Sequence, residues 1–351
     1  MKKLWPLFTL IMVFLLTACL PAEEVSTVVP APPDPVDHLS SEAIKIGFSM
    51  DTLEEDRWAK DRELFKEAAE RAGAEVTITV ADGDDVKQVW QTEKMISEGI
   101  DVLVVVPHNA ESMAAIVERA HDAGIKVLSY DRLVRNAEVD LYVSYDNEQV
   151  GVLQAEAITK LVPKGRYVYL GGAETDYNAH LMKQGVFSVL KPLINSGEIT
   201  VVFNQWTKDW LPEYAKDNME IALDVNDKKI DAVIAGNDAT AGAAIEALEE
   251  LGLAGKIPVA GQDADLSGVR RIVEGTQSLT MYKSIDALSQ KAVELAIMLA
   301  EGEEITEDQT INNGKINVPS ILLPPVPVDE TNIHETVIAD GFHLEEEIFS
   351  P

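Results

Sequence analysis

Apolar runs alternate with amphipathic segments along most of this chain. The run 102–106 is apolar at every position, as expected of a strand that is covered on both faces of its sheet. A later segment places four apolar residues on one face of a helix, at positions i, i+3, i+4 and i+7: Met113, Ile116, Val117 and Ala120. Helices that alternate with such strands predict a parallel sheet built from βαβ units.

The helix–strand unit recurs and then restarts, which predicts two similar lobes. Glycines that can end a helix in the left-handed conformation precede successive apolar runs, at Gly73, Gly99 and Gly124. The pattern begins again after Asp146. There we expect helices from about 147 and over 178–193, 211–223 and 239–251, with strands over 167–170, 200–203 and 232–236.

The end of the chain departs from this alternation. A long helix is expected over 284–300, and the segment 310–323 is extended and contains proline. A chain that crosses between lobes more than once can form a hinge of several strands. We therefore predict an α/β fold of two Rossmann-like lobes with parallel central sheets joined by a multi-strand hinge. The first lobe would comprise 44–147 and 284–309, and the second 148–283 and 310–351.

Six of the expected strands end in clusters of polar residues. Ligands of open α/β sheets bind outside the carboxyl ends of the strands. Amide and carboxylate groups gathered at that edge indicate a site for a neutral, hydroxyl-rich ligand. The clusters are Met50-Asp51, Asp131-Arg132, Asp146-Asn147, the run from Gly171 to Asp176, Asn237-Asp238 and Gln262-Asp263.

The first residues have the pattern of an export signal. Lys2 and Lys3 precede the apolar stretch 4–16, which is short for a membrane span, and small residues precede Cys19. We predict a signal peptide over 1–18 and interpret the proline-rich segment 19–43 as a flexible tether. The residues around Cys19 also resemble the lipobox of bacterial lipoproteins, in which this cysteine is lipidated. The alternative is an ordinary cleaved signal with an incidental cysteine.

Composition excludes several classes of function. The chain has 60 acidic against 29 basic residues and a formal net charge of −31, which argues against nucleic acid or an anionic membrane surface as a partner. Cys19 is the only cysteine, so a disulfide or a thiolate metal site is excluded. Nucleotide-binding and hydrolase motifs are missing, and the six histidines lack metal-ligand spacing. We therefore expect no catalysis, no cofactor and no metal.

Arg57-Trp58, Asp131-Arg132 and Trp210 can each be interpreted in two ways. Arg57 could form a surface ion pair and Trp58 could belong to the core, or both could line a cleft. Asp131-Arg132 could be a salt-bridged loop, or a forked donor with a neighbouring acceptor for ligand hydroxyls. The charged neighbours of Trp210 favour an exposed platform on which a sugar ring could pack.

The later strand ends offer similar choices. We expect Asn237 to face the cleft while Asp238 caps the next helix. By the same logic Asp263 faces the ligand and Asp265 caps a helix. Lys283 could be a donor in the cleft or an exposed lysine at the hinge.

Taken together, segments from 44 to about 349 resemble the periplasmic sugar-binding proteins of ABC importers, which have the type I periplasmic binding protein fold. They are most similar to the members that bind D-xylose. Any one of these segments is a weak signal for the family, whereas eight segments that occur in the same order as in the family are a specific one. They are DRWAKDR at 56–62, YDR at 130–132, YDNE at 145–148, DWLPE at 209–213, GNDATAG at 236–242, GQDADL at 261–266, MYK at 281–283 and DGFH at 340–343.

The resemblance implies a pyranose held between the two lobes. The implied ligand contacts are Arg57, Asp131, Arg132, Asp176, Asn178, Trp210, Asn237, Asp263 and Lys283, with Trp58 as a stacking partner. Tyr177 departs from the small polar residue expected between Asp176 and Asn178, which bears on pocket size and on the preferred sugar.

The predicted function is that of a monomeric, lipid-anchored extracytoplasmic receptor that delivers a monosaccharide, D-xylose above others, to an ABC permease. A sensor that presents sugar to a chemoreceptor or a sensor kinase would use the same pocket. So would a binding protein for another aldose. A sugar-converting enzyme is disfavoured because no acid/base pair is evident. A repressor's sensory domain would carry a DNA-binding helix pair where this chain has an export signal.

Overall fold

The computed structural model describes residues 43–307 and 309–350. The predicted signal peptide, Cys19 and the tether up to residue 42 lie outside the described residues. Within the described part of the chain, no helix is both long and apolar enough to cross a membrane.

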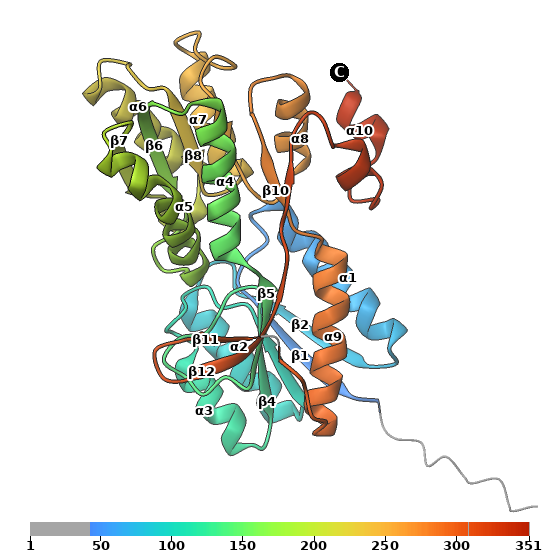
Figure 1. Cartoon of the computed structure of the whole chain (residues 1–351). Coiled ribbons are helices and arrows are strands. Elements are labelled where there is room, and N and C mark those ends of the chain that lie inside the picture. Colours follow the sequence, from blue (N-terminus) through green and yellow to red (C-terminus); the bar gives the residue numbers. More distant parts are fainter. Residues whose placement is uncertain (1–42, 308, 351) are drawn as a thin grey trace, which may run out of the picture. The chain divides into compact units, whose positions relative to one another are not determined.

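The first lobe is built on a seven-stranded sheet with the order β11-β12-β5-β4-β3-β1-β2 (Figure 1). Neighbouring strands are parallel except for β11, which pairs antiparallel with β12 at one edge. The strands are β1 (Lys45–Met50), β2 (Glu75–Val80), β3 (Val102–Val105), β4 (Lys126–Tyr130), β5 (Leu141–Tyr145), β11 (Gln309–Asn312) and β12 (Asn317–Leu323).

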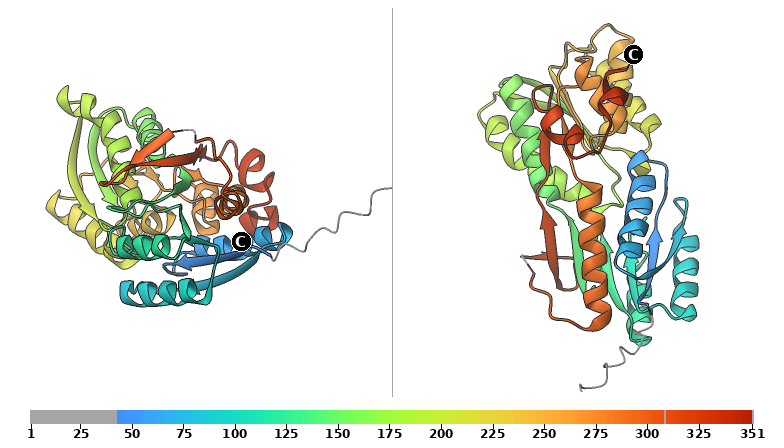
Figure 2. Two further views of the ribbon diagram at one scale, coloured as in Figure 1. Left: turned by 90° about the horizontal axis from the view of Figure 1, so that it is seen from below. Right: turned by 90° about the vertical axis from the view of Figure 1, so that its right-hand side faces the viewer.

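Helices cover both faces of this sheet, which explains why β3 is apolar and buried at every position. One core cluster joins the sheet to α1 (Asp56–Arg71) and α9 (Ile285–Glu301). The cluster on the other face includes α2 (Asp85–Glu98) and α3 (Ala114–Asp122). Figure 2 shows α9 running beside the strands, and α1 packs directly against it.

The second lobe has a four-stranded parallel sheet with the order β7-β6-β8-β9, which also lies between two core clusters. Its main elements are α4 (Asn147–Leu161), β6 (Gly165–Gly171), α5 (Tyr177–Asn195), β7 (Ile199–Trp206), a short 3₁₀ turn (Lys208–Trp210), α6 (Pro212–Val225), β8 (Ala232–Ala235), α7 (Asp238–Glu249), β9 (Val259–Ala260) and α8 (Leu266–Val273). They are followed by β10 (Thr280–Tyr282), β13 (Val326–Val328), a π-helical turn (His334–Ile338) and α10 (Glu345–Phe349).

Both sheets place the second strand of the lobe at an edge, then the first, the third and the fourth. The prediction of two similar α/β lobes with parallel central sheets is therefore confirmed. In the second lobe α4 and α5 pack closely because both have glycine at the contact. A Cβ at Gly151 would overlap the carbonyl oxygen of Met182, and one at Gly185 would overlap that of Glu148.

The chain passes between the lobes three times, after β5, after β10 and after β12. Figure 1 shows the last passage as the dark red segment that leaves β12 and continues beside β10. The crossings touch one another: Asp146 N–H donates to the Leu323 carbonyl at 3.0 Å, and the Tyr145 hydroxyl donates to the Ser284 carbonyl at 2.9 Å. These bonds tie the three hinge segments together.

The predicted boundary at residue 310 is wrong. Strands β11 and β12 belong to the first sheet, where β12 pairs with β5 in the register Ser320↔Tyr142. Val318 is fully buried in the core of the first lobe, which fixes the hairpin there. An extended segment with a proline can pair with the edge of either sheet, so the pattern alone could not assign it. The chain returns to the second lobe after Leu323.

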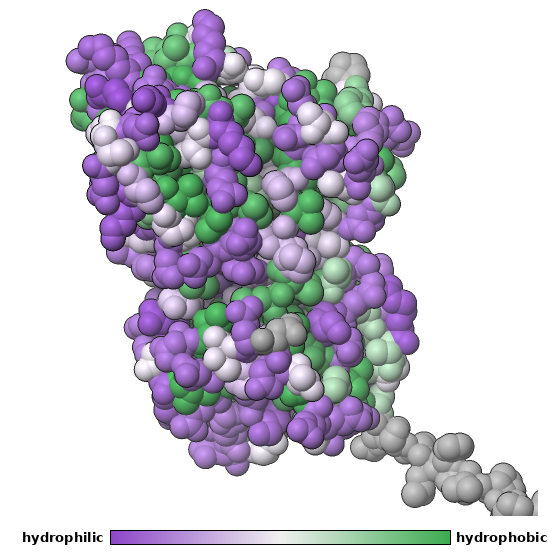
Figure 3. All heavy atoms as spheres, in the orientation of Figure 1, coloured by the Kyte–Doolittle hydropathy of each residue, from purple (hydrophilic) through white to green (hydrophobic). Residues whose placement is uncertain are grey.

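Polar side chains cover most of the face shown in Figure 3, in keeping with the strongly acidic composition. The large apolar side chains form the clusters on the two sheets instead.

Candidate functional site

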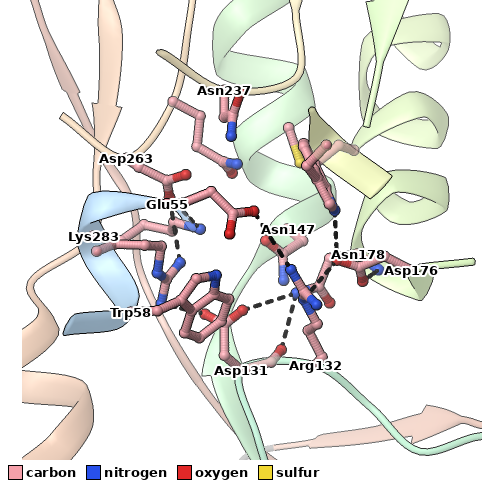
Figure 4. A pocket seen from close by; sticks show the side chains of 14 residues that line it. Glu55, Trp58, Asp131, Arg132, Asn147, Asp176, Asn178, Asn237, Asp263 and Lys283 are labelled. Carbon is pink, nitrogen blue, oxygen red and sulfur yellow. Dashed lines mark hydrogen bonds and ion pairs between the residues drawn. The ribbon is translucent and has the colours of Figure 1, made fainter. Parts of the chain in front are cut away.

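The polar strand ends meet in a pocket between the lobes (Figure 4). The empty space among its side chains is about 310 Å³, part of which is open to solvent. The structure brings all ten predicted ligand contacts together there, from both lobes. The lining residues are Glu55, Arg57, Trp58, Asp131, Arg132, Asn147, Asp176, Asn178, Met182, Trp210, Asn237, Gln262, Asp263 and Lys283.

The charges of the pocket are almost balanced. Three ion pairs, each at 2.9 Å, use every cation of the lining: Arg57–Asp131, Arg132–Asp176 and Lys283–Asp263. Glu55 is the fourth carboxylate, and its closest described cation is Arg132 at 3.9 Å. A site with such internal pairing has little net charge left for a charged ligand.

Several of these contacts join the two lobes. Arg132 follows β4 and Asp176 precedes α5, so their ion pair crosses the cleft. Arg57 on α1 also reaches Asp263 at 3.3 Å. Asn178 donates from Nδ2 to the backbone oxygen of Asp131 at 3.0 Å and to its carboxylate at 3.2 Å. The pocket is thus closed by its own polar side chains.

Burial and ion pairing compete in setting the carboxylate pKa values. Burial alone would raise the pKa of Asp131, but Arg57, Lys283 and Arg132 together outweigh it and lower that pKa. Burial prevails at Asp176, whose pKa is raised although Arg132 opposes the shift. Burial also raises the pKa of Glu55, because Arg132, the nearest cation among the described residues, is 3.9 Å away. The pocket therefore combines one firmly ionised carboxylate, Asp131, with two that resist ionisation, Asp176 and Glu55.

Four polar atoms of the lining are buried and have no hydrogen-bond partner among the described residues. They are Trp58 Nε1, Glu55 Oε2, Asn147 Oδ1 and Gln262 Oε1. Figure 4 shows Glu55, Trp58 and Asn147 at the centre of the site. A buried polar group without a partner costs on the order of 1–3 kcal/mol. One donor and three acceptors around one space are therefore suited to a ligand that both donates and accepts.

Two tryptophans form walls of the pocket. Trp58 is buried, with the guanidinium of Arg57 at 4.3 Å and that of Arg132 at 5.0 Å from its ring centre. The prediction that Trp210 is an exposed platform is wrong, since the side chain is only 7% exposed. Its ring lies against Gly172 and Gly236, which leave room because they have no side chain.

Three pocket residues are held in the left-handed backbone region that non-glycine residues rarely adopt. The φ angles are +58° at Asp131, +60° at Trp210 and +87° at Asp263. Local bonds hold this geometry: the Tyr142 and Ser144 hydroxyls both donate to the Asp131 carbonyl, at 2.8 and 2.7 Å. Backbone strain of this kind is concentrated at binding and catalytic sites, where it aims side chains.

The predicted caps are only partly correct. Asn237, rather than Asp238, is the N-cap of α7, and it forms a capping box with Thr240. Asp238 is the first helical residue, and its buried carboxylate accepts from Gln277, Thr280 and the backbone N–H of Asp265. This carboxylate ties α7 to the start of α8. Asp265 occupies the predicted N-cap position of α8, but its side chain forms no capping hydrogen bond with the helix.

Sequence reasoning missed four lining residues. Asn147 and Gln262 stand in polar strand ends, but the resemblance implies no ligand contact for either residue. Glu55 lies in an acidic run whose members cannot be told apart by pattern. Met182 is apolar and carries no signal. Asp51, which had no assigned role, supports Arg132 through an ion pair at 2.6 Å.

No group of three or more histidine, cysteine, aspartate or glutamate side chains within residues 43–307 and 309–350 is arranged to hold a metal ion.

Comparison with known proteins places the fold and the site in a family. A periplasmic binding protein domain matches residues 46–304. The chain is 50% identical to the D-xylose-binding periplasmic protein of Haemophilus influenzae over 88% of its own length and 93% of that protein. It is also 50% identical to the D-xylose-binding periplasmic protein of Escherichia coli, over 87% of this chain and 92% of the other.

A solved structure gives the same assignment. The carbohydrate transporter solute binding protein of Chloroflexus aurantiacus, in complex with D-glucose, superimposes with a TM-score of 0.81 at 31% identity. That match covers 88% of this chain and 98% of the other. These relatives are binding proteins, so the predictions of family and of a non-enzymatic role are confirmed. The chain belongs to the periplasmic binding protein family.

Proposed function

We propose that this protein binds a neutral monosaccharide, D-xylose above others, between its two lobes and delivers it to an ABC permease. The relatives at 50% identity are D-xylose-binding periplasmic proteins, and the structural relative is a carbohydrate transporter solute binding protein. They support a sugar as the ligand, transport as the role and a location outside the cytoplasm.

The four buried polar atoms without partners carry the proposal for the ligand class. A sugar hydroxyl donates one hydrogen bond and accepts others, so several hydroxyls can serve Trp58 Nε1 and the free oxygens of Glu55, Asn147 and Gln262 together. An apolar ligand would leave these atoms unsatisfied. An anion would meet four carboxylates, and the three cations are already paired.

The shape of the pocket favours a single small ring. The faces of Trp58 and Trp210 can pack against the C–H groups of a pyranose, while the polar groups contact its hydroxyls. Closure of the lobes strengthens each of these contacts because it excludes water.

A ligand panel tests the proposal. Thermal unfolding should be followed with D-xylose, L-arabinose, D-ribose, D-glucose, D-galactose and xylitol, and each positive result measured by calorimetric titration. We expect the largest rise in Tm, and the lowest Kd, with D-xylose. A larger effect of D-glucose would refute the assignment to xylose, and no shift with any aldopentose or hexose would refute the sugar site.

We also propose that Cys19 is lipidated and that the protein acts as a membrane-tethered receptor. The support is the sequence around Cys19, which is the only cysteine. Expression in a bacterial host, followed by mass spectrometry of the mature N-terminus, should show a diacylglyceryl group on Cys19. A Cys19→Ser variant should leave the membrane fraction. An unmodified Cys19 in the mature protein would exclude the tether.

A further inference from the structure

Tyr177 lies between two pocket residues in sequence but does not line the pocket. Asp176 and Asn178 both face the ligand site, whereas the Tyr177 side chain packs against the core cluster of the first lobe. Tyr177 is the first residue of α5 and belongs to the second lobe. We propose that it is the centre of an interlobe clasp that stabilises the closed form without touching the ligand.

The clasp comprises Ala110 and Arg135 of the first lobe with Thr175 and Tyr177 of the second. The Arg135 guanidinium lies 4.6 Å from the centre of the Tyr177 ring. Alongside, Ala110 N–H donates to the Thr175 carbonyl at 3.2 Å. The two lobes are therefore joined by an apolar contact, a cation–π contact and a backbone hydrogen bond at one place.

Arg135 is well held for this role. Its backbone N–H donates to the Ala110 carbonyl at 2.6 Å, which sets the two first-lobe members of the clasp against each other. Its Nε is buried and has no hydrogen-bond partner among the described residues. The aromatic face of Tyr177 is thus a main contact of this guanidinium, and that contact forms only when the lobes are together.

Contacts that exist in one conformation alone shift the equilibrium toward it. Because the clasp forms on closure and lies outside the pocket, it should lower Kd for every ligand by the same factor and slow ligand release. A small polar residue at 177, which the family resemblance implies, could supply neither the apolar nor the cation–π contact. The tyrosine therefore changes how firmly the pocket closes rather than which sugar it prefers.

The test compares Tyr177→Ser with Tyr177→Phe, which keeps the ring and serves as the matched control. Binding of D-xylose and D-glucose is measured by calorimetry, and release by stopped-flow tryptophan fluorescence. For Tyr177→Ser we expect Kd and the release rate to rise about tenfold, equivalent to about 1.4 kcal/mol. The ratio of the two Kd values should not change, and Tyr177→Phe should stay within about twofold to threefold of the wild type.

Wild-type affinity and release in Tyr177→Ser would overturn the clasp. A changed Kd ratio would also overturn it, because Tyr177 would then shape the pocket. The affinity readouts rest on the proposed sugar site, so ligand-free scattering provides a separate readout. If the ligand-free wild type has the radius of gyration of the closed structure, the radius should be larger for Tyr177→Ser but not for Tyr177→Phe. Equal radii in that case would refute the clasp.

Discussion

Removing the side chain of Arg132 should weaken sugar binding more than most single changes in this protein. The guanidinium is buried and contacts two carboxylates closely, Asp51 at 2.6 Å and Asp176 at 2.9 Å. It also lies 5.0 Å from the ring centre of Trp58. In Arg132→Ala the pocket loses a cation, a forked donor and an ion pair that joins the lobes.

The size of the expected loss in binding depends on the partners that Asp51 and Asp176 retain in Arg132→Ala. Asp51 retains His108 at 2.9 Å, which compensates the charge of Asp51 while that histidine is protonated. Asp176 keeps two donors, Trp210 Nε1–H at 3.1 Å and the backbone N–H of Asn178 at 2.9 Å, but no cation. Removing one partner of a buried ion pair costs about 3–5 kcal/mol. Because Asp176 retains two hydrogen-bond donors, we expect a cost at the lower end of this range. A cost of about 3 kcal/mol corresponds to a rise in Kd of roughly 100-fold.

Calorimetric titration with D-xylose measures this change, and circular dichroism checks that the variant is folded. Arg132→Lys keeps a charge but not the fork, so its Kd should lie between wild type and alanine. Arg62→Ala removes a surface arginine and should leave Kd unchanged. The loss in Arg132→Ala should also be smaller at about pH 5 than at pH 8, because a protonated Asp176 tolerates burial without a cation. A Kd within threefold of wild type would refute the assignment.

Three further predictions concern stability and the pocket wall. The hydrogen bond to Asp51 raises the pKa of His108. The charge of His108 therefore stabilises the fold below about pH 6.5, and this stabilisation is lost as the pH rises through the raised pKa. His108→Ala should thus lower Tm more at pH 5.5 than at pH 8.5. Gly151→Ala should reduce the free energy of unfolding in urea by about 1–3 kcal/mol, since the new Cβ overlaps the carbonyl oxygen of Met182 and separates two helices. Trp210→Ala should raise the Kd for D-xylose at least tenfold, or about 1.4 kcal/mol, and should also lower Tm, because it removes a buried pocket wall.

Each of these three variants has a matched control. His334→Ala removes an exposed histidine, and at pH 5.5 it should lower Tm less than His108→Ala does. At Gly242 a new Cβ would meet only the flexible end of the Arg271 side chain, so Gly242→Ala should cost less than the change at 151. Trp90 is 63% exposed, and Trp90→Ala should leave Kd unaltered. Equal effects in a variant and its control would count against the corresponding prediction.

The lobe boundary and the roles of single side chains mark the limit of sequence reasoning here. Helices and parallel strands follow from local periodicity, because burial on one helical face or on both faces of a sheet imposes a fixed spacing. The pairing of 310–323 with the first sheet depends on which distant edge is open, and no local spacing reports that. The burial of Trp210 likewise depends on Gly172 and Gly236 from other strands.

The sequence by itself determined that this chain folds into two α/β lobes whose strands end in polar groups, since those features are written in neighbouring residues. Through the family resemblance it also predicted ten side chains as ligand contacts. Only the tertiary structure decided that they surround a single space, and that Glu55, Asn147 and Gln262 join them there with unpaired oxygens. It also turned Tyr177 away from the ligand and onto the other lobe. Such pairings join residues far apart in the chain, and their energies exist only once the lobes have been brought together.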